Sequence, residues 1–466
     1  MNLADRLRGV MVRRPGLAEG QISPSADPAR RLAEGQIPPS ADPAGRLAEC
    51  TIQHSADPAS ILGGEWREAG GQRFLVVDHR YAPGYRHGRS AVVDSAPDSA
   101  PDSAPDSAAD SAPDGAADGD DCCWPALSIF EPSLTSGRLL FLDLETTGLA
   151  GGAGTYAFLV GCGWFERGGF HVRQYLLTGF GAERAILEEV ARLVSDAGGL
   201  ATFNGKTFDV PLMETRFLFH RMGVTFAGMP HVDMLHPARR LWSTLESSCR
   251  LTTLERTLLG HVREGDVPGF EIPGRYFNFV RTGDARPLAG VLEHNRLDIL
   301  SLALVTARLA HLLGEGAAAA ATGREALGLG RMFDRAGMAG PASTCYDAAA
   351  ILGEDSDTIG EALRAAALIL RRARRYDEAA GAWGKILDLR PCPPALAREA
   401  VEALAVHHEH RARELGTARR FALESLSLTT NHSRIEAARH RLARIDRKLG
   451  GSPAPAGPRL DSAQLF

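Results

Sequence analysis

Apolar residues are spaced in two different patterns along the chain, and the change of pattern separates an α/β part from a helical part. From about residue 138 to residue 203, short runs of branched and aromatic residues are bounded by glycine and polar residues, which is typical of buried strands. These runs predict strands at 138–144, 156–165, 170–177 and 200–203. Residues 182–195 instead repeat apolar positions every three to four residues, which predicts a helix before the last of these strands.

Residues 315–450 keep the helical pattern throughout and are rich in alanine and arginine. Within them, residues 360–391 fit the tetratricopeptide pattern of about 34 residues. Its small, aromatic and proline positions are occupied by Ala367, Tyr376, Ala379, Trp383 and Pro391. A preceding repeat fits Gly330, Phe333, Ala342, Tyr346 and Ala349, and a weaker third fits Ala418 and Ala422. The pattern predicts stacked helix pairs that bind a protein partner, with a generic helical bundle as the alternative.

Composition marks off the other segments. Residues 1–62 contain an imperfect 15-residue repeat with few large apolar residues, which predicts a disordered tail because the segment cannot bury a core. Residues 63–94 form a small strand-containing segment. Residues 95–121 consist largely of Ser, Ala, Pro and Asp, and residues 451–466 begin with Gly and Pro, so we expect an extended linker and a flexible tail. Residues 122–314 are then the expected α/β domain.

Four carboxylates and one histidine lie in order along the predicted elements. Asp143 and Glu145 end the first strand, where side chains two residues apart share one face. Asp209 follows an Asn-Gly turn near the start of a helix. His294 and Asp298 are four residues apart and lie on one helical face. Each pattern alone is usually structural, as a solvated strand edge, a helix cap or a surface hydrogen bond. Together they predict one shared site.

The residue types at this site fit phosphodiester hydrolysis. Two cations about 3.5–4 Å apart activate a water and stabilise the charge of the transition state. Mg²⁺ and Mn²⁺ prefer oxygen ligands, so a set of Asp and Glu without Cys suits them better than zinc. We expect Asp143 to bridge two Mg²⁺ or Mn²⁺ ions, with Glu145, Asp209 and Asp298 completing their ligands. His294 could accept the proton of the attacking water, since histidine titrates near neutral pH.

Residues around these positions resemble those of the DEDD exonucleases of the ribonuclease H-like superfamily, and most of all its YprB-like group. The likeness covers about residues 139–313, a little over a third of the chain. It rests on the segments Asp143-x-Glu145-Thr-Thr-Gly, Asn204-Gly-Lys-x-Phe-Asp209-x-Pro211, Val232-Asp-Met-Leu-His236 and His294-Asn-x-x-Asp298. The resemblance implies a ribonuclease H-like mixed sheet flanked by helices, with the Asp143 strand at its centre, and a 3′–5′ exonuclease with Asp143, Glu145, Asp209 and Asp298 as metal ligands.

One position departs from the larger DEDD families. Their catalytic tyrosine lies four residues before the last aspartate, whereas their catalytic histidine usually lies five before it. Here a histidine, His294, occupies the tyrosine spacing.

Four neighbouring residues are candidates for substrate binding: Thr146, Gly148, Asn204 and Lys206. A lysine could hold a phosphate, and a glycine lets the backbone approach the substrate closely. The alternative is that Lys206 is an exposed turn residue and that the threonines beside Gly148 cap a strand.

Composition narrows the remaining choices. A net charge of −5 argues against a protein that coats nucleic acid, but it allows a local basic strip, for which we consider Arg239 and Arg240 with Arg216, Arg221, Arg250 and Arg256. Seven cysteines without a Cys-x-x-Cys pair argue against a structural zinc site and against a disulfide framework. No apolar run reaches about 18 residues, so we expect a cytoplasmic protein without a membrane span.

The sequence therefore predicts a metal-dependent nuclease, with a catalytically silent adaptor as the rival. The adaptor would hold nucleic acid or protein on its α/β domain while its helical repeats recruit a partner. The presence of all four carboxylates favours the nuclease. The motifs do not choose between DNA and RNA, because the acids act on phosphates and no base-reading motif is present.

Overall fold

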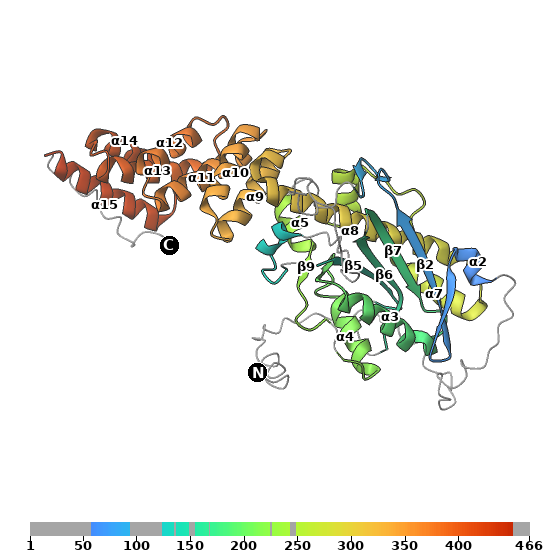
Figure 1. Ribbon diagram of the computed structural model, residues 1–466. Helices are drawn as coiled ribbons and strands as arrows, with labels where there is room; N and C mark the ends of the chain where they lie inside the picture. Colours follow the sequence, from blue (N-terminus) through green and yellow to red (C-terminus); the bar gives the residue numbers. More distant parts are fainter. Residues whose placement is uncertain are drawn as a thin grey trace, which may run out of the picture. The chain divides into compact units, whose positions relative to one another are not determined.

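The computed structural model describes residues 57–93, 124–134, 137–148, 154–166, 168–223, 226–242 and 248–450 (Figure 1). The predicted linker, the C-terminal tail and most of the predicted N-terminal tail lie outside these residues. Helix α2 (Pro58–Leu62) falls before the boundary expected at residue 62. Asp57 caps this helix and accepts a hydrogen bond from Trp66 Nε1 at 2.8 Å. A local polar contact thus ties the end of the expected tail to the first strand.

A seven-stranded mixed sheet forms the centre of the α/β part, in the order β1-β2-β7-β6-β5-β8-β9. Its strands are β1 (Glu65–Ala69), β2 (Gln72–Tyr81), β5 (Leu139–Thr146), β6 (Ala157–Glu166), β7 (Gly169–Leu176), β8 (Gly199–Thr202) and β9 (His231–Asp233). β5, β8 and β9 run parallel, whereas the other neighbours are antiparallel. The expected fold class is confirmed. β1 and β2 extend the sheet beyond β7, so β5 is the fifth of seven strands and not the central one that was expected. The sequence predicted a strand within residues 63–94 but not its pairing with β7.

Helices cover both faces of the sheet, and β5 shows the division. Leu140 and Leu142 belong to an apolar cluster with residues of α3 (Glu183–Ser195), α4 (Asp209–Phe219) and α7 (Ile272–Thr282). Leu139 and Phe141, which alternate with them, pack in a second cluster with α8 (Ala289–Glu315). A strand covered on both faces reads as a continuous apolar run, as this one does. The core therefore consists of two layers, with β5 between them.

Shorter elements connect these layers. They are β3 (Arg86–His87), β4 (Ser90–Ala91), α6 (Leu251–Leu254), and the single-turn elements η2 (Pro125–Ile129), η3 (Phe180–Ala182), η4 (Glu255–Leu259), η5 (Arg286–Leu288) and η6 (Gly316–Ala319). The η4 turn has the wider π-helical hydrogen bonding, a local form that is frequent at functional sites.

Helix α8 is long and apolar enough to cross a membrane by length and composition alone. However, 72% of its apolar window is buried inside the fold, where its residues pack on the sheet. A core helix of a folded domain accounts for this composition.

The helical part begins after α8. Its helices are α9 (Gly323–Arg335), α10 (Ala339–Leu352), α11 (Ser356–Arg372), α12 (Tyr376–Leu387), α13 (Pro394–His410), α14 (Leu415–Ser427) and α15 (His432–Lys448). Each helix packs against the next one along the chain. Most small and aromatic positions of the predicted repeats are buried, among them Ala342, Tyr346, Ala379 and Trp383, whereas Tyr376 is half-buried. The helical region is confirmed, whereas its assignment as tetratricopeptide repeats stays a prediction.

Helix α5 (Leu235–Trp242) joins the sheet to the helical part. It follows β9 directly and packs against α9. Trp242 Nε1 donates a hydrogen bond to Glu325 Oε1 of α9 at 3.0 Å, and both residues are buried. At Gly328 of α9, a Cβ would lie 2.8 Å from the carbonyl oxygen of Arg240, so the helices meet closely there because glycine has no side chain.

Candidate active site

Strand β5 points two carboxylates toward helix α8. Leu139 and Phe141 pack on the α8 face, and Asp143 and Glu145 continue the same alternation. A bulge between Glu145 and Thr146 interrupts the pairing with β6 directly after the second carboxylate. Bulges of this kind occur often beside active sites because they redirect a strand. The end of β5 therefore presents both acids where the regular sheet stops.

Asn295 of α8 holds Asp143 in place. Its Nδ2 donates to Asp143 Oδ2 at 2.8 Å and to the Asp143 carbonyl at 3.2 Å, while its Oδ1 accepts from Gln174 Nε2 at 2.8 Å. Gly161 of β6 pairs with Asp143, and a Cβ there would lie 2.2 Å from Asn295 Oδ1. Only glycine leaves room for this buried amide. The network orients Asp143 through hydrogen bonds to its carboxylate and its carbonyl.

The loop between β8 and α4 presents Asp209, the first residue of α4. Asn204 turns the chain with a φ of +71°, a conformation that asparagine tolerates better than most residues. The buried carboxylate of Asp233 accepts hydrogen bonds from the backbone N–H groups of Asn204 at 2.7 Å and Lys206 at 3.1 Å. At Gly205, a Cβ would lie 2.8 Å from Asp209 Oδ2. The turn thus needs glycine beside Asp209, and Asp233 fixes the turn from the end of β9.

Burial and neighbouring negative charges raise the pKa of Asp143, Glu145 and Asp209. For Asp143, burial is the largest cause, and the negative charges of Asp298, Glu145 and Asp209 raise its pKa further, well above the ordinary value. Burial and the charges of Asp298 and Asp209 likewise raise the pKa of Glu145 well above its ordinary value. Burial, followed by the charge of Asp233, raises the pKa of Asp209 to about 7. Strand, loop and helix therefore bring the four predicted acids together.

A divalent cation fits this set of donors. Buried carboxylates of like charge resist ionisation, and a bound cation is a partner that favours their charged form at neutral pH. Every donor of the set is oxygen, which Mg²⁺ and Mn²⁺ prefer. Asp143, Glu145, Asp209 and Asp298 are the residues that would hold such ions.

His294 lies at the edge of the acids, between them and Asp266. Its Nδ1 is 2.7 Å from Asp266 Oδ1. Its Nε2 is 3.6 Å from Asp298 Oδ2 and 4.0 Å from Glu145 Oε1. Because an ionised carboxylate only accepts, His294 donates to Asp266 from Nδ1, and Nε2 faces the site. The four-residue spacing from Asp298 therefore places the imidazole beside the acids.

Arg263 is a buried cation that the structure adds to this group. Its Nη2 donates to Asp298 Oδ1, its Nη1 lies 3.4 Å from Asp266 Oδ2, and its Nε donates to Glu255 Oε2 at 2.7 Å. The side chain is only 5% exposed. Arg263 and Asp266 were missed by reasoning from the sequence. They lie 35 and 28 residues from Asp298 and His294, so no local spacing signals these contacts.

Comparison with known proteins places this site in a family. A model of the ribonuclease H superfamily matches residues 140–310, a range that contains the four acids and His294. The uncharacterized protein YprB of Bacillus subtilis (strain 168) is 32% identical over 316 residues, which span 67% of this chain and 75% of the relative. The chain belongs to the YprB-like family of the ribonuclease H superfamily. The expected resemblance is confirmed at this level.

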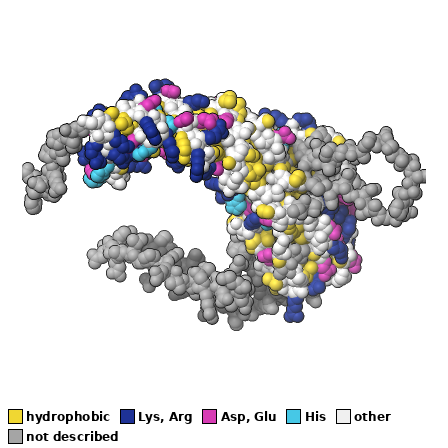
Figure 2. Space-filling view, turned by 60° about the vertical axis from the view of Figure 1, so that its left-hand side comes forward, with side chains coloured by type: hydrophobic (Ala, Val, Ile, Leu, Met, Phe, Trp, Pro, Cys, Tyr) yellow, Lys and Arg dark blue, Asp and Glu magenta, His cyan; other side chains and the backbone are white. Residues whose placement is uncertain are grey.

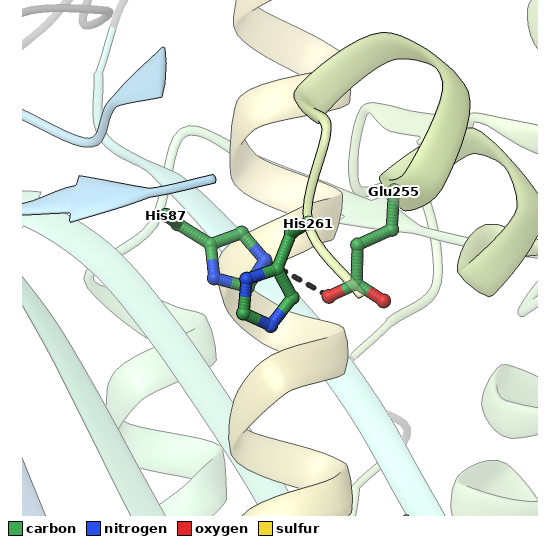
Figure 3. Close-up of side chains that lie close together, drawn as sticks. All are labelled: His87, Glu255 and His261. Atoms are coloured by element: carbon green, nitrogen blue, oxygen red, sulfur yellow. Dashed lines mark hydrogen bonds and ion pairs between the residues drawn. The ribbon is translucent and has the colours of Figure 1, made fainter. Parts of the chain in front are cut away.

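A second group of possible metal ligands in this YprB-like chain lies outside the four acids (Figure 3). His87, Glu255 and His261 offer ligand atoms within 4.8 Å of one another, a closer spacing than the four acids show among the described residues. Glu255 Oε1 already lies 2.9 Å from His87 Nε2 and accepts from Ser301 Oγ at 2.7 Å, and Arg263 holds Oε2. The two imidazole rings are tilted by 31° with centroids 4.1 Å apart, rather than converging on one point.

These contacts favour a buried clamp over a metal centre. His87 is on β3 and Glu255 begins η4, so their hydrogen bond fastens the β3–β4 hairpin to the turn that leads to Arg263. The backbone N–H of Arg89 reinforces the attachment by donating to the Leu259 carbonyl at 2.6 Å. The hairpin is thereby linked to the site through Glu255 and Arg263.

Of the predicted substrate-binding residues, Thr146 ends β5 and the other three lie on loops beside the site, and their role stays a prediction. Thr146 Oγ1 donates to the Gly148 carbonyl at 3.0 Å, so this hydroxyl already stabilises its own turn. Asn204 shapes the turn before α4, and the Lys206 side chain is exposed. Phe208, directly before Asp209, is 58% exposed.

One member of the predicted basic strip is wrong. Arg216 is fully buried and donates from Nε to Glu183 Oε1 at 2.6 Å, so it cannot belong to a binding surface. It occurs on α4 at a position that faces the apolar core, where a buried arginine requires a buried carboxylate. Arg239 and Arg240 are exposed on the last turn of α5.

Proposed function

We propose that this chain is a divalent-metal-dependent nuclease that hydrolyses single-stranded nucleic acid, acting as a 3′–5′ exonuclease. Membership of the ribonuclease H superfamily supports a nuclease-type activity. The observation that supports a metal-dependent activity is the convergence of Asp143, Glu145 and Asp209 with Asp298. Burial raises the pKa of the first three, and the charges of the neighbouring acids raise the pKa of Asp143 and Glu145 further. The 3′–5′ direction and the preference for single strands rest on the likeness to DEDD exonucleases alone.

Each residue has a distinct part in the proposed reaction. Two bound ions would supply an activated water and stabilise the developing negative charge. Asp143, fixed by Asn295, would hold the ions together with the other three acids. Asp266 accepts a hydrogen bond from the Nδ1–H group of His294. Nε2 then faces the acids and would take a proton from the attacking water. Asp266 is therefore a positioning residue for the base.

The first experiment asks whether nucleotides are released, from which end and from which nucleic acid. The full chain is incubated with 5′-labelled and 3′-labelled single strands of DNA and RNA, in Mg²⁺, in Mn²⁺ and in chelator. We expect metal-dependent shortening from the 3′ end. Asp143→Asn should abolish it, whereas Asp196→Asn, an equal change at an exposed residue outside the site, should not. Equal release by wild type and Asp143→Asn would overturn the assignment of the metal site.

An adaptor is the second candidate function, and one contact favours it. The Asp298 carboxylate already has Arg263 as a cationic partner inside the protein. Such a partner could balance the negative charge of an acid in a ribonuclease H-like domain that binds no metal. Calorimetric titration with Mn²⁺ discriminates the two. A nuclease binds the ion through its acids and loses this binding in Asp143→Asn, whereas an adaptor shows no titration and no release of nucleotides.

A further inference from the structure

A basic pocket lies where helix α5 meets the helical part. Its volume is about 490 Å³, within the range of pockets that hold small ligands. Five arginines line it: Arg239 and Arg240 from α5, and Arg324, Arg331 and Arg335 from α9. The opposing wall comes from the start of α11 and carries acids. Figure 2 shows basic side chains, in dark blue, gathered over the helical part and interspersed with acidic ones.

Two of the five arginines are neutralised inside the pocket, and three are not. Arg324 binds Asp355 at 2.9 Å, and Arg331 binds Glu361 at 3.1 Å. Within the part of the chain that the structure describes, no hydrogen bond or ion pair engages the charged groups of Arg239, Arg240 and Arg335. Asp357 is the remaining acid of the lining. The pocket lining therefore carries a surplus of positive charge.

Phosphate is the anion that matches this surplus best. Guanidinium groups bind phosphate oxygens through two parallel hydrogen bonds, which explains why arginine rather than lysine lines such sites. The wider surface has the same sign: residues 316–450 hold 21 Lys and Arg side chains against 17 Asp and Glu, although the whole chain has a net charge of −5. A polyanion would be attracted to this part of the chain and repelled by the rest.

Helix α5 connects the pocket to the candidate active site. Asp233, two residues before α5 begins, holds the backbone of Asn204 and Lys206 in the turn that presents Asp209. The helix has eight residues and is about 12 Å long. Its start thus borders the loop between β8 and α4 that presents Asp209, and Arg239 and Arg240 of its last turn line the pocket. A strand of a few nucleotides could contact both places.

We propose that this pocket binds backbone phosphates of the single-stranded nucleic-acid substrate, so that the helical part and the nuclease part hold one strand. The proposal rests on the proposed nuclease function and names the path of its substrate. It also gives the helical part a role in binding nucleic acid, beside the protein partner that its repeats predict. Sequence is not read here, since the contacts are to phosphate.

Binding is measured on the full chain without divalent metal, so that nothing is cleaved. The probe is a fluorescent 20-nucleotide strand, DNA and RNA in turn, titrated at several salt concentrations. We expect the double variant Arg239→Glu/Arg240→Glu to bind about 10-fold more weakly or worse. The slope of log affinity against log salt should fall by about 1.4, the value for two lost phosphate contacts on a single strand. The melting temperature confirms that the variant is folded.

The matched control reverses two exposed arginines outside the pocket, Arg413→Glu/Arg447→Glu, which changes the net charge equally. It should keep most of the affinity and the slope. An equal loss in both variants would overturn the pocket in favour of a diffuse charge effect, and no loss in the first would overturn it outright. If an acidic peptide binds the pocket and strand binding is unchanged by the first variant, the pocket serves a protein.

The outcome is separable from that of the proposed function. If the wild-type chain cleaves strands but the Arg239→Glu/Arg240→Glu variant binds them as tightly, the nuclease proposal stands and the pocket proposal fails. Wild-type chain that binds strands through the pocket without any hydrolysis retains the pocket and becomes the adaptor.

Discussion

The candidate active site and the basic pocket beside α5 handle charge in opposite ways. In the site, carboxylates of one sign are buried together, and burial raises the pKa of Asp143, Glu145 and Asp209. In the pocket, the arginines stay exposed, and carboxylates pair with only two of the five. Buried like charges lower stability unless a cation joins them, whereas exposed charges do little until a polyanion arrives. The first arrangement suits chemistry and the second suits binding.

The largest expected effect tests the buried side of this comparison. Asp143→Asn and Asp209→Asn should each abolish hydrolysis, because each removes a ligand charge from the proposed metal site, while the fold is kept or slightly stabilised without metal. Release of labelled nucleotides and melting temperature in chelator measure the two parts. Activity that persists in both variants, after a contaminating nuclease has been excluded, would show that the buried acids are not the metal site and that chemistry does not separate the two regions.

The next effect concerns the imidazole beside the acids. His294→Ala should lose about 10²–10⁴-fold in turnover with little change in strand affinity, because a general base acts in the transition state and not in binding. Asp266→Asn should lose less, since it only orients the ring through Nδ1. Mn²⁺ affinity should survive in both variants. A His294→Ala enzyme with the wild-type rate would make His294 a structural residue of α8.

A smaller effect uses pH to sharpen the contrast. The pKa of Asp209 is raised to about 7 in the folded chain, whereas an unfolded aspartate titrates near 3.9. From about pH 4 to pH 7 the folded chain keeps a proton that the unfolded chain has lost, so this group lowers stability as pH rises. In chelator, Asp209→Asn should therefore melt above wild type at pH 8, and the gap should shrink toward pH 5. A gap that does not change with pH would refute the raised pKa; Asp196→Asn is the control.

The smallest effect concerns the joint between the two regions. Trp242→Phe removes the indole donor that binds Glu325 Oε1 and should lower the free energy of unfolding by about 1 kcal/mol or somewhat more, because a buried acceptor loses its partner. Denaturant titration measures this change. Strand binding should weaken slightly if α5 and α9 must stay packed for the pocket to form. Unchanged stability would show that the two helices are held by their apolar contacts alone.

The carboxylates of the site could be predicted from the sequence because their spacing is local. Asp143 and Glu145 share a strand face two residues apart, and His294 and Asp298 share a helix face four apart. The partners that orient them could not be predicted. Asn295 lies 152 residues from Asp143, and only the packing of α8 over β5 brings them together. The same holds for Arg216, which the sequence places in a basic strip and the core buries against Glu183.

By itself, the sequence predicted the strands β5, β6, β7 and β8, the helical region that follows the α/β part and the four acids, because periodicity and short spacings encode these features within a few residues. The mixed sheet was expected from the resemblance to the ribonuclease H-like superfamily. Only the tertiary structure decided that β1 and β2 extend the sheet, that Arg263 and Asp266 stand beside the acids, and that α5 and α9 form a basic pocket. These features depend on contacts between distant segments. Such contacts follow from how apolar faces pack together, and no local pattern records them.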